Sequence, residues 1–132
     1  MSKKLINPKE LYNGSAFGMS QAVIETETGL LYISGQVDWN QQYEIVEKSV
    51  EGQTRRALNN LKIVLENAGS SVDQLLHVRA YVRGELGEQM STIAPIFSEF
   101  LGESRPALTG IGVASLASPE TLVEIEAVAS VK

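Results

Sequence analysis

An alternating pattern close to the C-terminal end most restricts what this chain can fold into. In residues 122–131 one side of the pattern is apolar, with Val123, Ile125, Ala127, Ala129 and Val131. The other side is mixed, with Leu122, Glu124, Glu126, Val128 and Ser130. A period of two indicates a β-strand whose two faces have different surroundings. A second apolar run, residues 107–113, follows Arg105-Pro106, and we expect both strands to contribute to the walls of any chemical site.

Three further strands are predicted upstream. Residues 21–26 and 30–34 form a hairpin around Glu27-Thr28-Gly29. In residues 76–83 we expect Leu76, Val78, Ala80 and Val82 to alternate with His77, Arg79, Tyr81 and Arg83. Residues 1–19 form a short edge strand at most, and the polar segment 37–46 is expected to be a loop.

Two amphipathic helices complete the pattern. The first begins after a capping Ser49, runs to about Asn67 and ends before Gly69. The second covers about residues 88–101, and because Pro95 interrupts it we expect the helix either to start late or to bend there. Its expected apolar stripe is Met90, Ile93, Ala94, Phe97, Phe100 and Leu101.

The element order ββαβαββ predicts one α+β domain spanning residues 1–132. Both helices are apolar on one side only, so both can cover one face of a mixed sheet in a two-layer sandwich. The opposite face then carries His77, Arg79, Tyr81, Leu122, Glu124 and Val128. Such a mixed face is neither a normal core nor a normal solvated surface, so we expect it to be buried in an oligomer.

Composition excludes several classes of function. The net charge of −5 argues against nucleic-acid partners and anionic membranes, which attract basic surfaces. The absence of cysteine excludes disulfides and thiolate chemistry. No apolar run approaches the roughly 20 residues that span a bilayer, and the first residues do not form a secretory signal, so we expect a cytoplasmic protein without membrane contact.

Conventional catalytic groups are few. The single histidine, His77, is better explained as a strand residue at an interface than as a catalyst. Glu124 and Glu126 would lie about 7 Å apart along a strand, which suits acid–base work as well as two solvated carboxylates. Gly110-Ile111-Gly112 lacks the context of a phosphate-binding loop and suggests close approach of a backbone or ligand. We expect no metal and no cofactor.

Several segments together resemble a known family. They are Leu31-Tyr32-Ile33-Ser34-Gly35-Gln36, Gln53-Thr54-Arg55-Arg56-Ala57-Leu58-Asn59-Asn60-Leu61, Glu66-Asn67-Ala68-Gly69, His77-Val78-Arg79-Ala80-Tyr81-Val82, Pro106-Ala107 and Val123-Glu124-Ile125-Glu126-Ala127. From about Ser20 to Val131 they are similar to the RidA/YjgF family, also labelled endoribonuclease L-PSP. The resemblance implies a chorismate-mutase-like α+β fold, a homotrimer, and small-molecule clefts between subunits.

The resemblance also implies hydrolysis of reactive imines and enamines to 2-oxo acids and ammonia. In the family an arginine after the Pro-Ala pair binds the substrate carboxylate, and here that position is Leu108. A family tyrosine aligns with Met19, and an asparagine aligns with Ala94. Ser34, Gly35 and a catalytic Glu124 are retained, with Thr109 beside the missing arginine.

A replacement cation is not evident from the sequence. Arg79 has a suitable face, although its place in a cleft is open, whereas Arg105 should have the wrong strand parity relative to Leu108. With three polar anchors replaced by apolar residues, we expect a preference for neutral or cationic ligands and slow deamination of 2-imino acids. The alternatives are a non-catalytic trimer that binds a ligand or partner and, less well supported, an endoribonuclease-type translation inhibitor.

Overall fold

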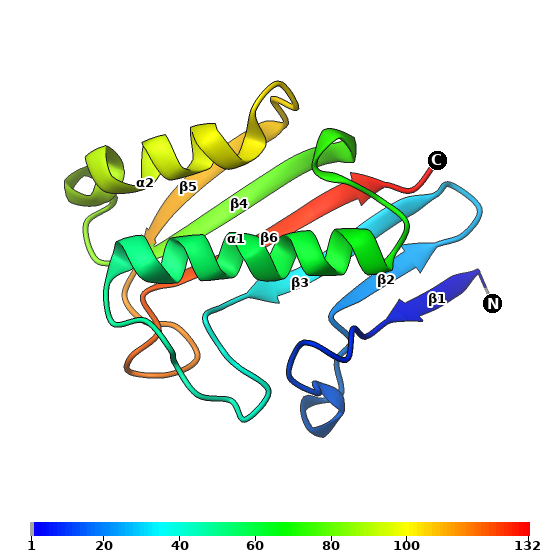
Figure 1. The fold of residues 1–132 in the computed structure, drawn as a ribbon, viewed down its shortest axis with the longest axis horizontal. Helices are drawn as coiled ribbons and strands as arrows, with labels where there is room; N and C mark the ends of the chain where they lie inside the picture. The colour runs from blue at the N-terminus through cyan, green and yellow to red at the C-terminus, as the bar shows by residue number, and fades with distance from the viewer. Residues whose placement is uncertain (1) are drawn as a thin grey trace.

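The computed structural model describes residues 2–132 and contains a mixed sheet of six strands with two long helices (Figure 1). The strands are β1 Lys3–Ile6, β2 Ala22–Glu25, β3 Leu30–Gln36, β4 Leu75–Arg83, β5 Ala107–Val113 and β6 Val123–Ser130. The helices are α1 Val50–Asn67 and α2 Leu86–Leu101, with short 3-10 helices at Ser15–Phe17 and Val72–Gln74. The strand order is β1-β2-β3-β6-β4-β5, and only the β4–β5 pair is parallel.

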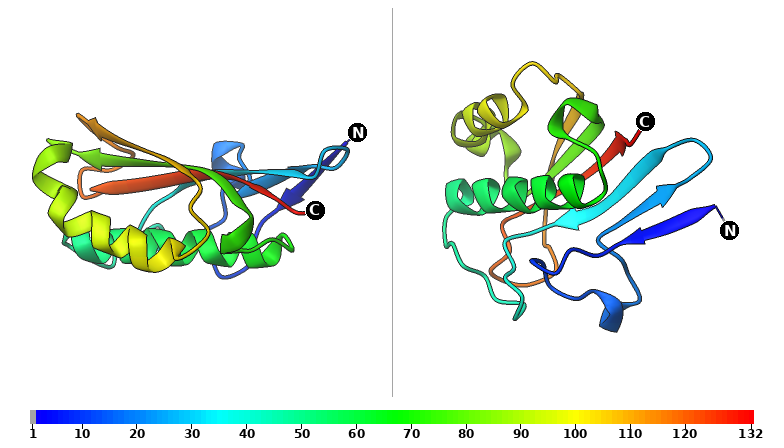
Figure 2. Two further views of the ribbon diagram at one scale, coloured as in Figure 1. Left: turned by 90° about the horizontal axis from the view of Figure 1, so that it is seen from above. Right: turned by 45° about the vertical axis from the view of Figure 1, so that its right-hand side comes forward.

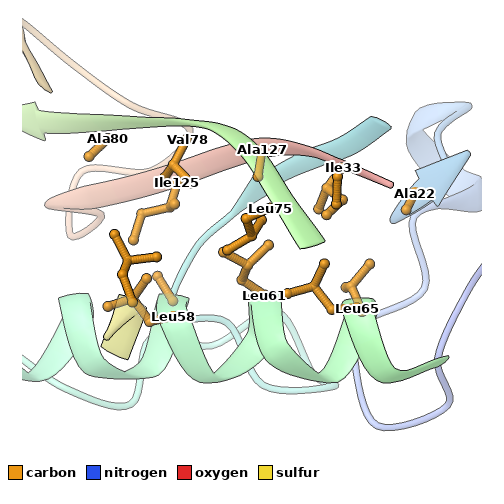
Figure 3. Close-up of a cluster of buried hydrophobic side chains, with 14 of the residues drawn as sticks. Ala22, Ile33, Leu58, Leu61, Leu65, Leu75, Val78, Ala80, Ile125 and Ala127 are labelled. Atoms are coloured by element: carbon orange, nitrogen blue, oxygen red, sulfur yellow. The ribbon is translucent and has the colours of Figure 1, made fainter. Parts of the chain in front are cut away.

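Both long helices lie on the same face of the sheet, as the view from above shows (Figure 2). Leu58, Leu61 and Leu65 of α1 point towards the sheet and meet Val78 of β4 and Ile125 of β6 (Figure 3). All five side chains are at most 1% exposed. The two-layer α+β sandwich predicted from the sequence is therefore confirmed, and the other face of the sheet is left open.

Residues at its two ends determine where α1 begins and where it stops. The Ser49 hydroxyl accepts a hydrogen bond from the Gly52 backbone N–H at 3.0 Å, which caps the helix as predicted. At the other end Gly69 has a φ of 79°, a left-handed conformation that glycine adopts without steric cost.

Helix α2 differs from its predicted form. It begins at Leu86, two residues earlier than expected, and Pro95 lies within it on an exposed side. The predicted stripe is partly wrong, because Met90 and Ala94 are exposed while Ile96 is buried. The two exposed apolar residues line a surface groove, which is described below.

The N-terminal part of β4 also differs from the prediction. Leu76 is 50% exposed, whereas its neighbour Leu75 is 4% exposed and joins the core. The cause is an irregularity in the pairing with β6 between Leu75 and His77, which shifts the alternation by one residue. From Val78 onwards the predicted alternation is correct. Among the described residues, no helix is both long and apolar enough to cross a lipid bilayer.

Candidate functional site

The open face carries a charged cluster where β4 and β6 pair. Tyr81 lies opposite Glu124, and Arg79 lies opposite Glu126. The Tyr81 hydroxyl donates a hydrogen bond to Glu126 Oε1, which raises the pKa of Tyr81, and Arg79 Nη1 lies 3.9 Å from the same oxygen. Arg79 is therefore directed at Glu126 rather than at Glu124.

Glu124 occupies a different environment from its neighbour Glu126. A Cβ atom at Gly35 would lie 2.2 Å from Glu124 Oε2, so the carboxylate lies against the bare backbone of β3. Burial raises the pKa of Glu124, and the nearby charge of Glu126 adds to the rise. Both effects disfavour the charged form, and this combination is frequent for a carboxyl group at a functional site.

The Glu124 carboxylate opens into a hollow of about 250 Å³. The lining residues are Tyr12, Phe17, Met19, Ser34, Gly35, Val37, Trp39, Ala117 and Glu124. We call this region the Glu124 hollow. It brings together four of the predicted site residues, namely Met19, Ser34, Gly35 and Glu124, from a loop and two adjacent strands.

Aromatic side chains form one wall of the Glu124 hollow, and sequence reasoning missed them. The Tyr12 and Trp39 ring centroids lie 5.0 Å apart, and those of Phe17 and Trp39 lie 6.4 Å apart. Tyr43 packs behind them, 6.0 Å from Trp39. Most of the chain's few aromatic residues outside the helices fall in segments 12–17 and 39–43, and this clustering was the available signal.

The Tyr12 hydroxyl lies beside Met19, the position where the family has a tyrosine. It contacts Met19 Sδ at 3.9 Å, and Tyr12 as a whole is 8% exposed. Burial raises the pKa of Tyr12, and the charge of Glu124 contributes to the same rise. A phenolic hydroxyl is therefore present in the Glu124 hollow although residue 19 does not supply it.

Buried polar contacts hold the loops around the hollow. Asp38 is fully buried and forms an ion pair with Arg56 of α1, while its Oδ2 accepts a hydrogen bond from the Glu47 N–H at 2.6 Å. The segment 37–46 is a loop as predicted, but burial of Asp38 was not foreseen. This ion pair fixes the residue next to Trp39.

A second anchor is the side-chain amide of Gln53, which is also fully buried. Its nitrogen donates to the carbonyls of Glu47 and Glu120 at 3.1 and 2.9 Å, and its oxygen accepts from the Leu122 N–H at 2.8 Å. One side chain of α1 therefore joins the loops on either side of the Glu124 hollow. These loops lie at the same end of the sheet (Figure 1).

The floor of the hollow is fixed by hydrogen bonds within β3 and the segment before β2. The Ser34 hydroxyl donates to the Ser20 carbonyl at 2.7 Å. The buried Gln36 amide donates to Gln21 Oε1 and to the Ser34 carbonyl, each at 3.0 Å. Because Gln21 in turn donates to the Tyr12 carbonyl at 2.9 Å, the floor and the aromatic wall are connected.

Leu108 lies in a different region of the same chain. It pairs with Val78, whose side chain faces the helices, whereas Glu124 points to the open face. A groove of about 630 Å³ runs between β5 and α2. It is lined by Ala80, Leu86, Met90, Ile93, Ala94, Phe97, Ser98, Leu101, Gly102, Arg105, Pro106, Leu108 and Gly110, and we call it the Leu108 groove.

The Leu108 groove changes three expectations. Strands β5 and β6 are separated by β4, so they do not form the walls of one site within a chain. Thr109 is on the opposite face from Leu108, beside Arg79. Arg105 lines the same groove as Leu108, so the parity argument against it was wrong. It fails because Arg105 precedes β5 and has a φ of 49°, outside the strand region.

His77 lies on the open face, between Val128 of β6 and Ala107 of β5, and is half-buried. Within residues 2–132 no group of three or more histidine, aspartate or glutamate side chains could hold a metal ion. The acid–base candidate that the structure supports is Glu124, which lines the same hollow as Tyr12 and has a raised pKa.

Comparison with known proteins gives the family. Residues 14–131 match the family model described as endoribonuclease L-PSP. A putative regulator AldR of Lactococcus lactis is 36% identical over 105 residues, covering 79% of this chain and 81% of that protein. A 2-iminobutanoate/2-iminopropanoate deaminase of Dermatophagoides farinae is 30% identical over 110 residues, covering 83% and 82%.

Among solved structures, the chain is similar to a protein of unknown function of the conserved Rid family, YyfB from Yersinia pestis. The identity is 38%, the TM-score is 0.72, and the match covers 98% of this chain and 99% of that one. The sequence match and the fold agree. The chain therefore belongs to the endoribonuclease L-PSP family, also called RidA/YjgF.

Proposed function

We propose that this protein hydrolyses small reactive imines or enamines in clefts between the subunits of a homotrimer, with Glu124 as the catalytic carboxylate. The observation that carries the proposal is the Glu124 hollow: a half-buried carboxylate with a raised pKa lies against Gly35, in a hollow that Tyr12 also lines. One relative that matches most of the chain is named as an imine deaminase.

The trimer supplies the second half of the site in this proposal. Glu124 and Leu108 face opposite sides of one sheet, so only another copy can place a Leu108 groove against a Glu124 hollow. Strand β5 is at an edge of the sheet, and its residues are mostly apolar and largely exposed. An uncovered apolar edge strand favours pairing with another chain, which supports assembly.

The chemistry needs one water molecule and no cofactor. Glu124 accepts a proton as the water oxygen attacks the imine carbon, and the nitrogen takes up a proton as the carbon–nitrogen bond breaks. In balance, one imine and one water give one carbonyl compound and one ammonia, with no change of oxidation state. A raised pKa suits a group that must both accept and return a proton near neutral pH.

The decisive assay measures ammonia release from freshly generated 2-aminoacrylate and from an enamine without a carboxylate, with the wild type and Glu124→Gln. We expect acceleration of at least one substrate and loss of about a hundredfold in Glu124→Gln, as for a general acid–base group. Acceleration that is unchanged in Glu124→Gln would exclude this mechanism. No acceleration of either substrate would favour the non-catalytic alternative.

The assembly is tested separately by light scattering. We expect a trimer at micromolar concentration, and a stable monomer would contradict the intersubunit site. The family label also suggests ribonuclease activity, but the net charge of −5 does not favour binding of RNA.

A further inference from the structure

The Glu124 hollow combines two kinds of group that attract cations. The first is the Glu124 carboxylate, and the second is the aromatic wall of Tyr12, Phe17 and Trp39. The face of an aromatic ring carries negative potential and binds ammonium-type cations within about 6 Å. The described residues that line the hollow include no lysine, arginine or histidine.

Within one chain, the charges beside the hollow have a negative sum. Glu126 is the neighbouring carboxylate on the open face, and Arg79 is the cation that pairs with it, at 3.9 Å. With Glu124, Glu126 and Arg79 all ionised, this part of the face carries a net negative charge. An anionic ligand in the hollow would therefore meet repulsion, and a cation would be attracted.

The aromatic wall is also held in place before any ligand arrives. The ring of Tyr12 is buried and packs edge-on against Trp39, and the segment carrying Trp39 is fixed by the Asp38–Arg56 ion pair. Phe17 is 62% exposed at the rim, where its ring is accessible to a ligand. Preorganised groups lose little entropy on binding, which favours a defined site over an accidental depression.

We propose that the Glu124 hollow binds the cationic end of a small organic molecule, an iminium or ammonium group, between the Glu124 carboxylate and the aromatic side chains of Tyr12, Phe17 and Trp39. This rests on the proposed function, because it names the substrate class for the same site: imines derived from simple amines rather than from amino acids. The reaction then converts one iminium ion and one water into one carbonyl compound and one ammonium ion, so atoms and charge balance. The class of reaction that supplies such a substrate is the two-electron oxidation of an amine.

The test is calorimetric binding of three molecules of similar shape and different charge. Isobutylamine is cationic at neutral pH, isobutyramide is neutral and isobutyrate is anionic. We expect isobutylamine to bind tightest to the wild-type protein. Tightest binding of isobutyrate would overturn the proposal.

Variants assign the preference to the two kinds of group. Glu124→Gln should weaken isobutylamine binding by about tenfold to a hundredfold, the range for a charge-assisted contact, and should leave isobutyramide nearly unchanged. Trp39→Leu should weaken isobutylamine by about fivefold, whereas Trp39→Phe keeps a ring and should restore most of the affinity. Unchanged isobutylamine binding in Glu124→Gln would also overturn the proposal.

Two control variants remove charged side chains that do not line the hollow. Glu126→Gln removes the same charge from the same strand outside the hollow lining, and its effect should be less than that of Glu124→Gln. Arg105→Gln tests the cation of the Leu108 groove and should not weaken isobutylamine. If isobutyrate binds best and Arg105→Gln abolishes that binding, the groove and not the hollow selects the ligand.

The outcomes also separate this inference from the proposed function. Isobutylamine binding that depends on Glu124, without any imine hydrolysis, would support the cation site and contradict the enzyme. Hydrolysis that depends on Glu124, with no preference for isobutylamine, would support the enzyme and contradict the cation site. Thermal unfolding of each variant shows whether it remains folded.

Discussion

The Glu124 hollow and the Leu108 groove differ in almost every physical respect. The hollow measures about 250 Å³, lies at the end of the open face and combines a carboxylate with aromatic rings. The groove measures about 630 Å³, lies between β5 and α2 and is almost entirely apolar, with Arg105 as the only charged residue among its described lining residues. Residues that the family resemblance assigns to one pocket are thus divided between two surfaces of one chain.

The difference shows that the polar groups suited to chemistry lie in the Glu124 hollow, whereas the Leu108 groove provides mainly apolar surface. The hollow supplies the groups that can transfer a proton or attract charge, and it is fixed by buried polar contacts from α1. The groove supplies apolar area and depends on side chains that are exposed within one chain, such as Met90 and Leu108. A change in one region should therefore leave the folded structure of the other region in the same chain intact, which can be tested by mutation.

The largest effect is expected on the loop that carries the aromatic wall. Arg56→Met leaves the fully buried Asp38 without its cation. We expect a loss of about 2 to 3 kcal/mol in the free energy of unfolding, below the value for a fully buried pair because Arg56 is 35% exposed. Urea denaturation measures the loss of unfolding free energy. Quenching of Trp39 fluorescence by an added quencher measures how far the loop that carries Trp39 has become exposed.

The matched control is Arg55→Met on the adjacent residue. Arg55 lies 3.8 Å from Glu51, and both side chains are more than half exposed, so the expected cost is at most about 0.5 kcal/mol. Equal destabilisation by the two variants would show that the ion pair of Asp38 does not hold the loop.

A second prediction concerns the contact between β3 and the carboxylate of Glu124, which we propose to be catalytic. Gly35→Ala places a methyl group where Glu124 Oε2 now lies, so the side chain must rotate away. We expect imine hydrolysis to fall by about a hundredfold with little change in melting temperature, since misplacement of about 1 Å has effects of this order.

Gly110→Ala provides the comparison in the Leu108 groove. Its Cβ would lie 3.1 Å from Leu86 Cδ2, the end of a flexible side chain that can move. Hydrolysis should change much less than in Gly35→Ala. Equal loss of activity in both variants would contradict the prediction that Gly35 acts by leaving room for the Glu124 carboxylate.

A third prediction concerns a substitution in the Leu108 groove that should favour binding of an anionic ligand. Leu108→Arg introduces the cation that the family resemblance implies at this position, and we expect binding of pyruvate to become about tenfold tighter, because a charge-assisted arginine–carboxylate contact contributes at least this much. Leu108→Met is the control for size. Pyruvate that already binds the wild type tightly, and that is lost in Arg105→Gln, would show that Arg105 performs this role.

The smallest effect is on the pH dependence of stability. Because the pKa of Glu124 is raised in the folded state, the folded protein holds this proton more tightly than the unfolded chain. Stability contributed by the protonated group is therefore lost as pH rises from the ordinary glutamate range through the raised pKa. Glu124→Gln should raise the melting temperature at neutral pH and flatten its decline as pH rises from the ordinary glutamate range, as measured by calorimetry.

The elements themselves were largely predictable from the sequence. The period-two pattern of β6 and the amphipathic character of α1 depend only on which side chains must be buried, and both predictions are confirmed. The error at Leu76 arose because a local shift in pairing with β6 cannot be read from either strand alone. Burial of Asp38 was missed for a similar reason, since its partner Arg56 lies 18 residues away in another element.

The candidate site was predictable only in part. Ser34, Gly35 and Glu124 were found because local patterns and the family resemblance mark them, and β3 and β6 are adjacent in the sheet. Tyr12, Phe17 and Trp39 were missed because loops carry no periodic pattern, and their convergence depends on contacts made by Asp38 and Gln53.

By itself, the amino-acid sequence determined the class of fold, the helices, the face of most strand residues and the family. These follow from burial of apolar side chains at fixed local periods, which act over a few residues. Tertiary structure alone decided that β4 separates β5 from β6, that Leu108 and Arg105 share a groove away from Glu124, and that aromatic rings line the same hollow as the carboxylate. The physical reason is that strand order and loop packing depend on contacts between residues far apart in the chain, and no local period records them.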